Sequence, residues 1–254
     1  MKISVVTACF NSAKTIRHTL DSFAAQTHAD KEMLIVDGLS RDGTLDIVRS
    51  YNLPGIRIIS ERDKGIYDAM NKGLRNFGGD AVGTLNSDDT FHDRFALERV
   101  AEALNDADIA YGDLAMVSDH VSKRPVRIWQ AGAYTSSAFR LGWVPPHPTF
   151  YVRRGVIDAV GEFDLTFKIA SDYDFMLRAM MLHQFRIRYI DKILVDYQMG
   201  GNSSNGLRNI VLGNLECLTS RRRNLGSLPV DLAFVVRPFR RLSQWRAAKA
   251  LSQD

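Results

Sequence analysis

The sequence predicts an α/β fold in which a mostly parallel central sheet is flanked by helices. Three observations support this fold class. Short apolar runs alternate with helical patterns over the first 90 residues, polar residues stand where those runs end, and 45% of the 254 residues are apolar against 24% charged. Buried strands that alternate with helices are typical of parallel sheets covered on both faces. No apolar run approaches the roughly 18 residues that a membrane span needs.

The first four strands follow one another at short intervals, each followed by a helical pattern. We expect strands at residues 3–7, 33–36 and 56–59, and a fourth strand from Val82 that stops at Asn86. We expect three helices between them: one that contains Ile16–Ala24, one that begins after a cap at Ser40, and one that spans residues 66–76. Asn11 and Ser12 are candidate caps of the first helix. Beyond Asp89 the pattern is less regular, with a helix near residues 95–104 and short strands around 109–111 and 126–129.

Polar residues follow the ends of these strands and reach two adjacent carboxylates, Asp88 and Asp89. The carboxyl ends of parallel strands meet at one edge of a sheet, where ligands bind. Adjacent carboxylates repel each other, so one interpretation is a site for a hard divalent cation. The other is that Ser87 or Asp89 caps the helix that begins near Asp93. Neither G-x-G-x-x-G nor G-x-x-x-x-G-K-[ST] occurs, which disfavours dinucleotide oxidoreductases and P-loop NTPases.

Four segments in register resemble a known family. They are ISVVTACFN at Ile3–Asn11, LIVDGLSRDGT at Leu34–Thr44, SERDKGIYDAMNKG at Ser60–Gly73 and LNSDD at Leu85–Asp89. They are similar to motifs of the family 2 inverting glycosyltransferases, and among these to bacterial exopolysaccharide and colanic-acid transferases. The resemblance implies the GT-A nucleotide-sugar-binding fold. It also implies transfer of a sugar from a nucleotide sugar, with a UDP-sugar as the expected donor, to a saccharide or lipid-linked saccharide in bacterial polysaccharide biosynthesis.

The resemblance assigns eight residues to the nucleotide sugar: Thr7, Asn11, Asp37, Asp63, Tyr67, Asn71, Asn86 and Ser87. Asp37 is expected to bind the base, and its alternative role is that of a turn residue before Gly38. Asp63 is assigned to the base and ribose pocket or, alternatively, is a solvated charge in a turn. Tyr67 and Asn71 are expected to face the same cleft, although Tyr67 fits a core position equally well.

The metal site carries a departure from the family pattern. Asn86 stands where the family's D-x-D motif has its first Asp, and a neutral amide is a weaker metal ligand. We therefore expect Asp88, with Asp89 beside it, to bind the divalent metal, Mn²⁺ or Mg²⁺, and Asn86 to contact the sugar or ribose.

The second half of the chain is expected to build the acceptor side, with candidates His147, Asp172, Asp174 and Arg178. By resemblance Asp172 is the catalytic base, while Ser171 or Asp172 is also a credible helix cap, and the two roles are not exclusive. Asp174 and Arg178 are supporting residues. His147 lies between prolines that restrict its backbone, which makes it a candidate for contact with the diphosphate or the acceptor. A lone loop histidine, however, usually has no special role.

We expect one catalytic domain over residues 1–218, with a nucleotide-sugar-binding half at 1–110 and an acceptor-side half at 111–218. A basic amphipathic tail then covers 219–254, where eight basic and two acidic groups give a net charge of +6. Such a tail can contact an anionic membrane, bind nucleic acid or pack on the body. The resemblance favours peripheral membrane contact, and no nucleic-acid partner is expected. Residues 198–206 have the composition of a mobile loop, either a lid or an ordinary connection.

Two cysteines, Cys9 and Cys217, are far apart and lack metal-ligand spacing, which fits a reducing compartment. We therefore expect a cytoplasmic protein that is peripheral on the inner face of the plasma membrane. Two other functions stay open. A sugar nucleotidyltransferase would show a glycine-rich loop with a basic residue after the first strand, and a catalytically silent binding subunit would lack Asp88 or Asp172.

Overall fold

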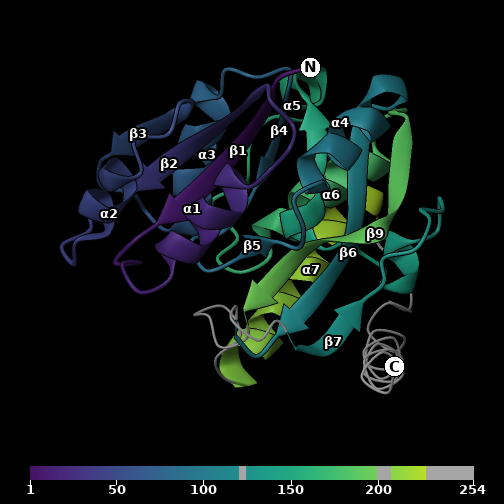
Figure 1. The fold of residues 1–254 in the computed structure, drawn as a ribbon. Helices are drawn as coiled ribbons and strands as arrows, with labels where there is room; N and C mark the ends of the chain where they lie inside the picture. The colour runs from purple at the N-terminus through teal and green to yellow at the C-terminus, as the bar shows by residue number, and fades with distance from the viewer. Residues whose placement is uncertain (120–123, 199–206, 227–254) are drawn as a thin grey trace.

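A computed structural model describes residues 1–119, 124–198 and 207–226, and Figure 1 shows helices on both faces of one sheet. The first half contains β1 (Ile3–Cys9), α1 (Ile16–Ala24), β2 (Lys31–Asp37), α2 (Thr44–Ser50), β3 (Ile56–Ser60), α3 (Ile66–Asn76) and β4 (Ala81–Thr84). The second half contains β5 (Thr90–Phe91), α4 (Ala96–Asp106), β6 (Ile109–Val117), β7 (Pro125–Trp129), β8 (Tyr151–Arg153), α5 (Arg154–Val160), α6 (Ser171–Met181), β9 (Ile187–Gln198) and α7 (Leu207–Leu225). Two 3₁₀ turns, η1 (Phe139–Leu141) and η2 (His147–Thr149), precede β8.

The first four strands confirm the predicted parallel arrangement. β1 pairs in parallel with β2 and β4, and β2 pairs in parallel with β3. The register places Cys9 opposite Asp37 and Asp37 opposite Ser60, so the carboxyl ends of these strands meet at one edge. The predicted span of α3, residues 66–76, is confirmed.

The second half makes the sheet mixed, and the strand order is β3-β2-β1-β4-β8-β6-β9-β5 with β7 on β6. β8 runs antiparallel to both β4 and β6, whereas β6 and β9 are parallel. The predicted α/β fold class is confirmed. The parallel pairs are those among β1 to β4 and the pair β6 with β9, and the antiparallel pairs of β5, β7 and β8 make the sheet mixed. β8 is three residues long, and it lies beside β4 because the chain returns to the sheet after η2. So short a strand has no distinct sequence pattern.

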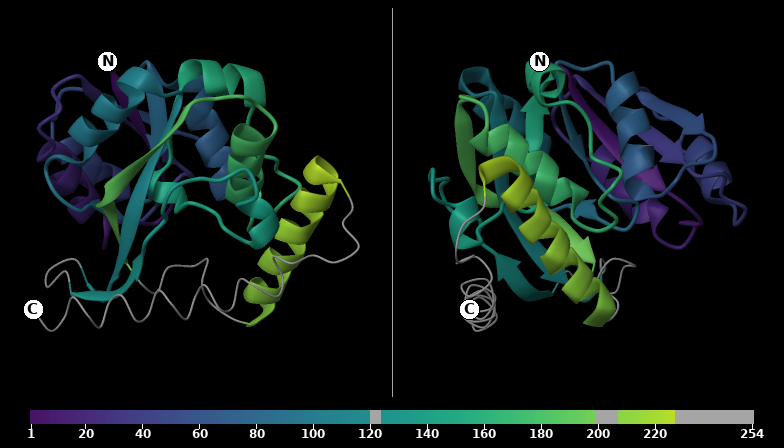
Figure 2. Two further views of the ribbon diagram at one scale, coloured as in Figure 1. Left: turned by 90° about the vertical axis from the view of Figure 1, so that its right-hand side faces the viewer. Right: turned by 180° about the vertical axis from the view of Figure 1, so that it is seen from behind.

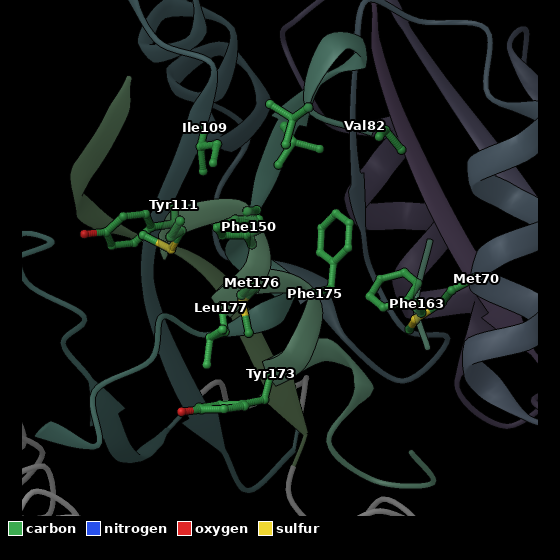
Figure 3. Packing of buried hydrophobic residues seen from close by; sticks show 14 of the residues in the cluster. Met70, Val82, Ile109, Tyr111, Phe150, Phe163, Tyr173, Phe175, Met176 and Leu177 are labelled. Carbon is green, nitrogen blue, oxygen red and sulfur yellow. The ribbon is translucent and has the colours of Figure 1, made fainter. Parts of the chain in front are cut away.

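Two buried clusters cover the two faces of the sheet. Alternate residues of β1 supply them: Val6 and Ala8 pack beneath α3 and α6, and Ile3 and Val5 pack beneath α1 and α4. Figure 3 shows Phe163 and Phe175 of the first cluster close together, beside α3. At Gly73 of α3 an added Cβ would lie 2.3 Å from a methyl carbon of Val6, so only glycine lets this helix approach β1 so closely.

The helix caps are formed differently from the sequence predictions. The N-cap residues of α1, α2 and α6 are Thr15, Gly43 and Ala170, and none of them makes a side-chain capping hydrogen bond. Asn11, Ser12 and Ser40 are therefore not the N-caps that local sequence suggested, and neither Ser171 nor Asp172 is the N-cap of α6. The loops before α1 and α2 are instead bonded to each other: the Asn11 N–H donates to Ser40 Oγ, and the Ser12 N–H donates to Thr44 Oγ1. These contacts between the ends of two strands hold the backbone where the two helices begin.

α7 runs through the predicted domain boundary between residues 218 and 219, and it lies beside α6 at the end of the described chain (Figure 2). Of the predicted loop at 198–206, only Gln198 is among the described residues. The tail after Gly226 also lies outside them. Within residues 1–119, 124–198 and 207–226, no helix combines the length and the apolar character needed to cross a bilayer.

Candidate functional site

The loops after β1 and β2 are tied to each other at the carboxyl edge of the sheet. The Asn11 backbone N–H donates to Ser40 Oγ at 2.8 Å, and Asn11 Oδ1 accepts from the Arg41 N–H at 3.0 Å. Asn11 and Leu39 have positive φ values of 51° and 66°, which non-glycine residues adopt only when the surroundings impose them. The contacts of Asn11 therefore hold a strained pair of loops in one arrangement, beside the predicted nucleotide site.

Asp37 is fully buried at the end of β2 and holds this edge together. Its Oδ2 accepts from Ser60 Oγ at 2.7 Å, and the Ser40 N–H donates to both carboxylate oxygens at 3.2 Å. Cys9 Sγ lies 3.8 Å from Oδ1. Burial, reinforced by the Asp37 charge, raises the pKa of the Cys9 thiol to about 12. In this structure Asp37 has the contacts of a strand-end turn residue.

Phe10, Gly38 and Asp63 lie together above the ends of β1 to β3. A Cβ added to Gly38 would lie 2.4 Å from Asp63 Oδ2 and 3.3 Å from Phe10 Cδ2, so a larger residue there would displace the Asp63 carboxylate. Asp63 Oδ1 accepts from the Gly65 N–H at 2.9 Å. Phe10 is 64% exposed, although it is a large aromatic side chain directly after a buried strand. The sequence analysis did not single out Phe10, and its position in the strand-end cluster was the available signal.

Thr7 lies inside β1 and is fully buried. Its Oγ1 is one of the buried side-chain atoms without a hydrogen-bond partner among the described residues. Thr7 is thus beneath the loops that form the edge, while Asn11 and Phe10 are in them.

The turn after β4 separates the two adjacent carboxylates. Asp89 is fully buried, and Asn86 Nδ2 donates to its Oδ2 at 2.9 Å. Burial, followed by the nearby charge of Asp88, raises the pKa of Asp89 well above its ordinary value. Asp88 is partly exposed, and Ser87 Oγ lies 2.8 Å from Ser12 Oγ in the loop after β1. Asp88 is therefore the carboxylate that this turn leaves accessible. Neither Ser87 nor Asp89 caps α4, whose N-cap residue is Phe95.

Asp172 lies in the first turn of α6 and is joined to α3 by Tyr67. Asp172 Oδ1 accepts from the Tyr67 hydroxyl at 3.1 Å and from the Tyr173 N–H at 2.8 Å. The same hydroxyl also donates to the Ile169 carbonyl oxygen, at 2.5 Å, so its one proton is shared between two acceptors. Burial, followed by the Asp172 charge, raises the pKa of Tyr67 far above its ordinary value, so Tyr67 remains a hydrogen-bond donor. The structure thus unites two predicted residues that are 105 positions apart.

His147 connects the end of β4 with the start of α6. Its Nε2 lies 3.4 Å from Thr84 Oγ1, two residues before Asn86, and its ring contacts Phe163 at 5.6 Å between centroids. Burial lowers the pKa of His147, and the charge of Asp172 opposes that change. The imidazole is therefore neutral at pH 7, with the negative Asp172 close enough to influence it.

Three predicted site residues are instead engaged in internal contacts. The Asn71 amide exchanges two hydrogen bonds of 2.9 Å with the Phe163 backbone and is 1% exposed. Asp174 accepts from Arg178 Nε and from Ser220 Oγ, both at 2.7 Å. The Arg178 guanidinium also donates to two backbone carbonyl oxygens at and just beyond the end of α5, those of Val160 and Glu162. Asn71 thus fastens α3 to the chain before α6, and Asp174 and Arg178 fasten α6 to its neighbours.

Comparison with known proteins identifies a common family. The sequence profile described as glycosyl transferase family 2 matches residues 4–159, more than half of the chain. A PGL/p-HBAD biosynthesis glycosyltransferase of Mycobacterium bovis is 32% identical over 209 residues, which cover 80% of this chain and 78% of the relative. An uncharacterized glycosyltransferase of Bacillus subtilis is 27% identical over 238 residues, which cover 90% and 87% of the two chains.

Solved structures share the fold. Residues 1–349 of Staphylococcus aureus TarS, in complex with UDP-GlcNAc, superimpose with a TM-score of 0.66 at 22% identity and cover 92% of this chain and 69% of that one. The mannosyltransferase PcManGT of Pyrobaculum calidifontis, in complex with GDP-Man and Mn²⁺, superimposes with a TM-score of 0.68 at 19% identity and covers 99% and 75%. The α/β architecture, with its curled mixed sheet, is therefore that of these proteins.

Proposed function

We propose that this chain, which belongs to glycosyl transferase family 2, is an inverting transferase that moves a sugar from a nucleotide sugar to a saccharide or lipid-linked saccharide acceptor. The observation that carries the proposal is the position of Asp172. Tyr67 of α3 donates to this carboxylate at the start of α6. His147 contacts Thr84 at the end of β4, and the Asp172 charge acts on the pKa of its imidazole. A carboxylate is thus available beside the strand edge at which ligands bind in such sheets.

The donor is proposed to bind over the loops after β1 to β4. Phe10 offers an exposed aromatic face for a nucleobase, beside the Asp63 carboxylate, which can accept a hydrogen bond from the base or ribose. A UDP-sugar is preferred because TarS was solved with UDP-GlcNAc. PcManGT was solved with GDP-Man, which makes GDP-sugars the alternative donors to test.

A divalent ion fits this site if it arrives with the donor. In the described part of the chain, no three His, Cys, Asp or Glu side chains gather into a ready metal site. Mg²⁺ commonly binds to one or two carboxylates together with substrate phosphates and waters, so the single accessible carboxylate of Asp88 is sufficient. Asp89 is fully buried beside it and accepts from Asn86, so the proposal places the ion on Asp88. When bound, Mn²⁺ or Mg²⁺ stabilises negative charge on the diphosphate as a Lewis acid.

Asp172 is proposed as the general base. It takes the proton of an acceptor hydroxyl while that oxygen attacks the anomeric carbon from the face opposite the diphosphate. The new bond between the acceptor oxygen and the anomeric carbon forms as the bond to the diphosphate oxygen breaks, so the configuration inverts. Tyr67 donates to Asp172 Oδ1 and thereby orients the carboxylate. Neutral His147 lies beside the path between the donor edge and Asp172 and is proposed to contact the diphosphate or the acceptor.

A groove next to the start of α6 supports a lipid-linked acceptor in bacterial polysaccharide assembly. Its volume is about 690 Å³, and it is lined by Thr166, Lys168, Arg208, Val211, Leu212, Leu215 and Glu216. Val211 and Leu215 are 57% and 50% exposed, so an apolar surface adjoins two cationic side chains. This combination suits an anionic amphipathic acceptor.

Of the basic tail predicted at 219–254, the part beyond α7, residues 227–254, is proposed to rest on the anionic inner face of the plasma membrane. Ser220 and Asn224 of α7 hydrogen-bond to Asp174 of α6, so a test must keep α7 and remove only residues 227–254. Partition onto anionic liposomes that is unchanged by this truncation would contradict the proposal.

Donor hydrolysis tests the proposed function without knowledge of the acceptor, because water takes the place of the acceptor hydroxyl. UDP-GlcNAc, UDP-glucose, UDP-galactose and GDP-mannose, all with α configuration, are incubated with Mn²⁺ and followed by NMR. At least one donor is expected to release the β-sugar first. Asp172→Asn should slow this release by roughly 10²- to 10⁴-fold, as loss of a general base does, and leave nucleotide affinity unchanged.

The control is Asp158→Asn, because Asp158 is exposed on α5, which follows β8 at the opposite edge of the sheet. First release of the α-sugar contradicts inversion. Nucleotide binding without hydrolysis of any donor favours the silent binding subunit.

A further inference from the structure

A buried carboxylate on α7, that of Glu216, binds the chain segment that leads into α6. Glu216 Oε1 accepts from the Lys168 N–H at 3.0 Å, and Oε2 accepts from the N–H groups of Ile169 and Ala170, both at 2.9 Å. Glu216 is 9% exposed. A buried carboxylate that accepts three charge-assisted hydrogen bonds holds its three N–H donors strongly in place. Breaking these bonds would leave a buried charge and buried N–H groups without partners, which costs free energy.

The start of α6 depends on this distant residue because it has no local cap. Its N-cap residue, Ala170, makes no side-chain capping bond, and Ser171 Oγ donates to the Asp164 carbonyl oxygen instead. The positive end of the α6 dipole also favours a carboxylate at this position. In a capping box the N–H of the N-cap residue is bonded by a side chain of the helix's own first turn, and here Glu216 of α7 accepts from this N–H, that of Ala170. The other two donors, Lys168 and Ile169, lie just before the helix.

Two short paths join Glu216 to the proposed base. Ala170, whose N–H Glu216 accepts, is two residues before Asp172. Ile169 gives its N–H to Glu216, and its carbonyl oxygen contacts the Tyr67 hydroxyl, which also donates to Asp172 Oδ1. The Glu216 charge also contributes, after burial and Asp172, to raising the pKa of Tyr67.

We propose that Glu216 is a positioning residue for Asp172: by clamping the backbone of residues 168–170 it sets the place and orientation of the base. This inference rests on the proposed function, in which Asp172 is the base. It extends the active site to α7, which lies beyond the residues that match the family profile. Glu216 itself does not touch the reacting atoms, and its effect is on turnover, not on donor binding.

The test compares Glu216→Gln with Ser220→Ala. Ser220 is one helical turn further along α7 and donates to Asp174 of α6, so its loss weakens the same helix pair without touching residues 168–170. In the donor hydrolysis assay Glu216→Gln should lower kcat by one to two orders of magnitude, since a shift of about 1 Å in a catalytic group costs on the order of 10²-fold. The donor KM should stay within about twofold, as expected when ground-state binding is intact.

Amide hydrogen exchange supplies a readout that does not depend on turnover. Exchange at residues 168–170 should accelerate in Glu216→Gln and stay unchanged in Ser220→Ala. Glu216→Asp keeps the charge but shortens the side chain by one methylene. It should give a smaller loss of kcat and serves if Glu216→Gln fails to fold.

The double variant Asp172→Asn/Glu216→Gln separates the two claims. If Glu216 acts through Asp172, the double variant is no slower than Asp172→Asn alone. Multiplied losses, equal losses in Glu216→Gln and Ser220→Ala, or unchanged exchange at 168–170 overturn the role of Glu216 and leave the proposed function standing. Full activity of Asp172→Asn overturns the proposed function, and the role of Glu216 with it.

Discussion

Neighbouring residues in a motif can have opposite surroundings, as Asp88 and Asp89 do. Both were predicted as metal ligands because the sequence places them side by side at a strand end. The structure buries Asp89, where Asn86 donates to it and its pKa is raised, and leaves Asp88 partly exposed. Which member of the pair faces solvent depends on the turn after β4 and on the chain packed behind it. Neither the shape of this turn nor the packing behind it is encoded within the motif.

Tyr67 shows a predicted residue whose specific role required the fold. The sequence left open whether it faces the cleft or the core, and its hydroxyl lies against Asp172 and Ile169. Asn71, one turn further on α3, was predicted with it but is engaged by Phe163. Tyr67 and Asn71 differ in their contacts with residues about 100 positions away, and a local sequence pattern does not predict such contacts.

Tyr67→Phe is expected to lower kcat of donor hydrolysis by about tenfold and the free energy of unfolding by about 1 kcal/mol, the net value of a typical hydrogen bond. The hydroxyl that orients Asp172 is removed while the ring stays packed on Phe163. Steady-state kinetics and urea unfolding measure the two effects. A rate equal to that of the wild type would show that Asp172 needs no orienting donor.

At the scale of elements, the strands and helices of the first half were predictable because each is a short apolar run with clear breaks. The boundaries of α3 agree with the prediction, and β1 to β4 are parallel as expected. The caps were not predictable, since α6 begins at a loop held by Glu216. β8 was not predictable either, because three residues carry no periodicity.

The amino-end edge of the sheet has its own polar cluster, around Glu32 at the start of β2. Glu32 Oε2 accepts from Lys2 Nζ and Oε1 accepts from Ser4 Oγ, both at 2.7 Å, and the Gly78 N–H donates to Oε1 as well. Burial by itself raises the pKa of Glu32, but these hydrogen bonds outweigh it and hold the pKa below its ordinary value. The ionised form therefore stabilises the fold.

Glu32→Gln is expected to lower the free energy of unfolding at pH 7 by about 1.5 to 3 kcal/mol, as for hydrogen bonds to a charged group. The folded pKa is depressed, so this stability is fully present above the unfolded value of about 4.3 and is lost as pH falls through the folded pKa. Urea unfolding at pH 7 and at pH 3 measures the difference, with exposed Glu102→Gln on α4 as the control. A destabilisation of equal size at both pH values would contradict the linkage. Donor hydrolysis should be unaffected, since Glu32 is at the edge opposite the site.

At the scale of the whole molecule, the family could be predicted because it depends on motifs within the first 90 residues. The contacts around Asp172 could not, since they join α3, the start of α6 and α7, which are distant in sequence. The same dispersal explains why the predicted boundary at residue 218 divides α7. The described part of α7 belongs to the body and holds α6 in place.

The central claim is that a nucleoside diphosphate and a divalent ion bind together at the carboxyl edge of β1 to β4, with Asp88 as the accessible carboxylate. A thermal-shift and calorimetric panel of UDP, GDP, dTDP and CMP, with and without Mn²⁺, tests it most directly on the wild type, Asp88→Ala and the control Asp158→Ala. A ligand at 100 times its Kd stabilises a protein by about 2.7 kcal/mol, which both methods detect. We expect one diphosphate, UDP first among them, to stabilise the wild type and the control only with Mn²⁺, and Asp88→Ala to lose the effect. Stabilisation that persists in Asp88→Ala, or none with any nucleotide, would contradict it.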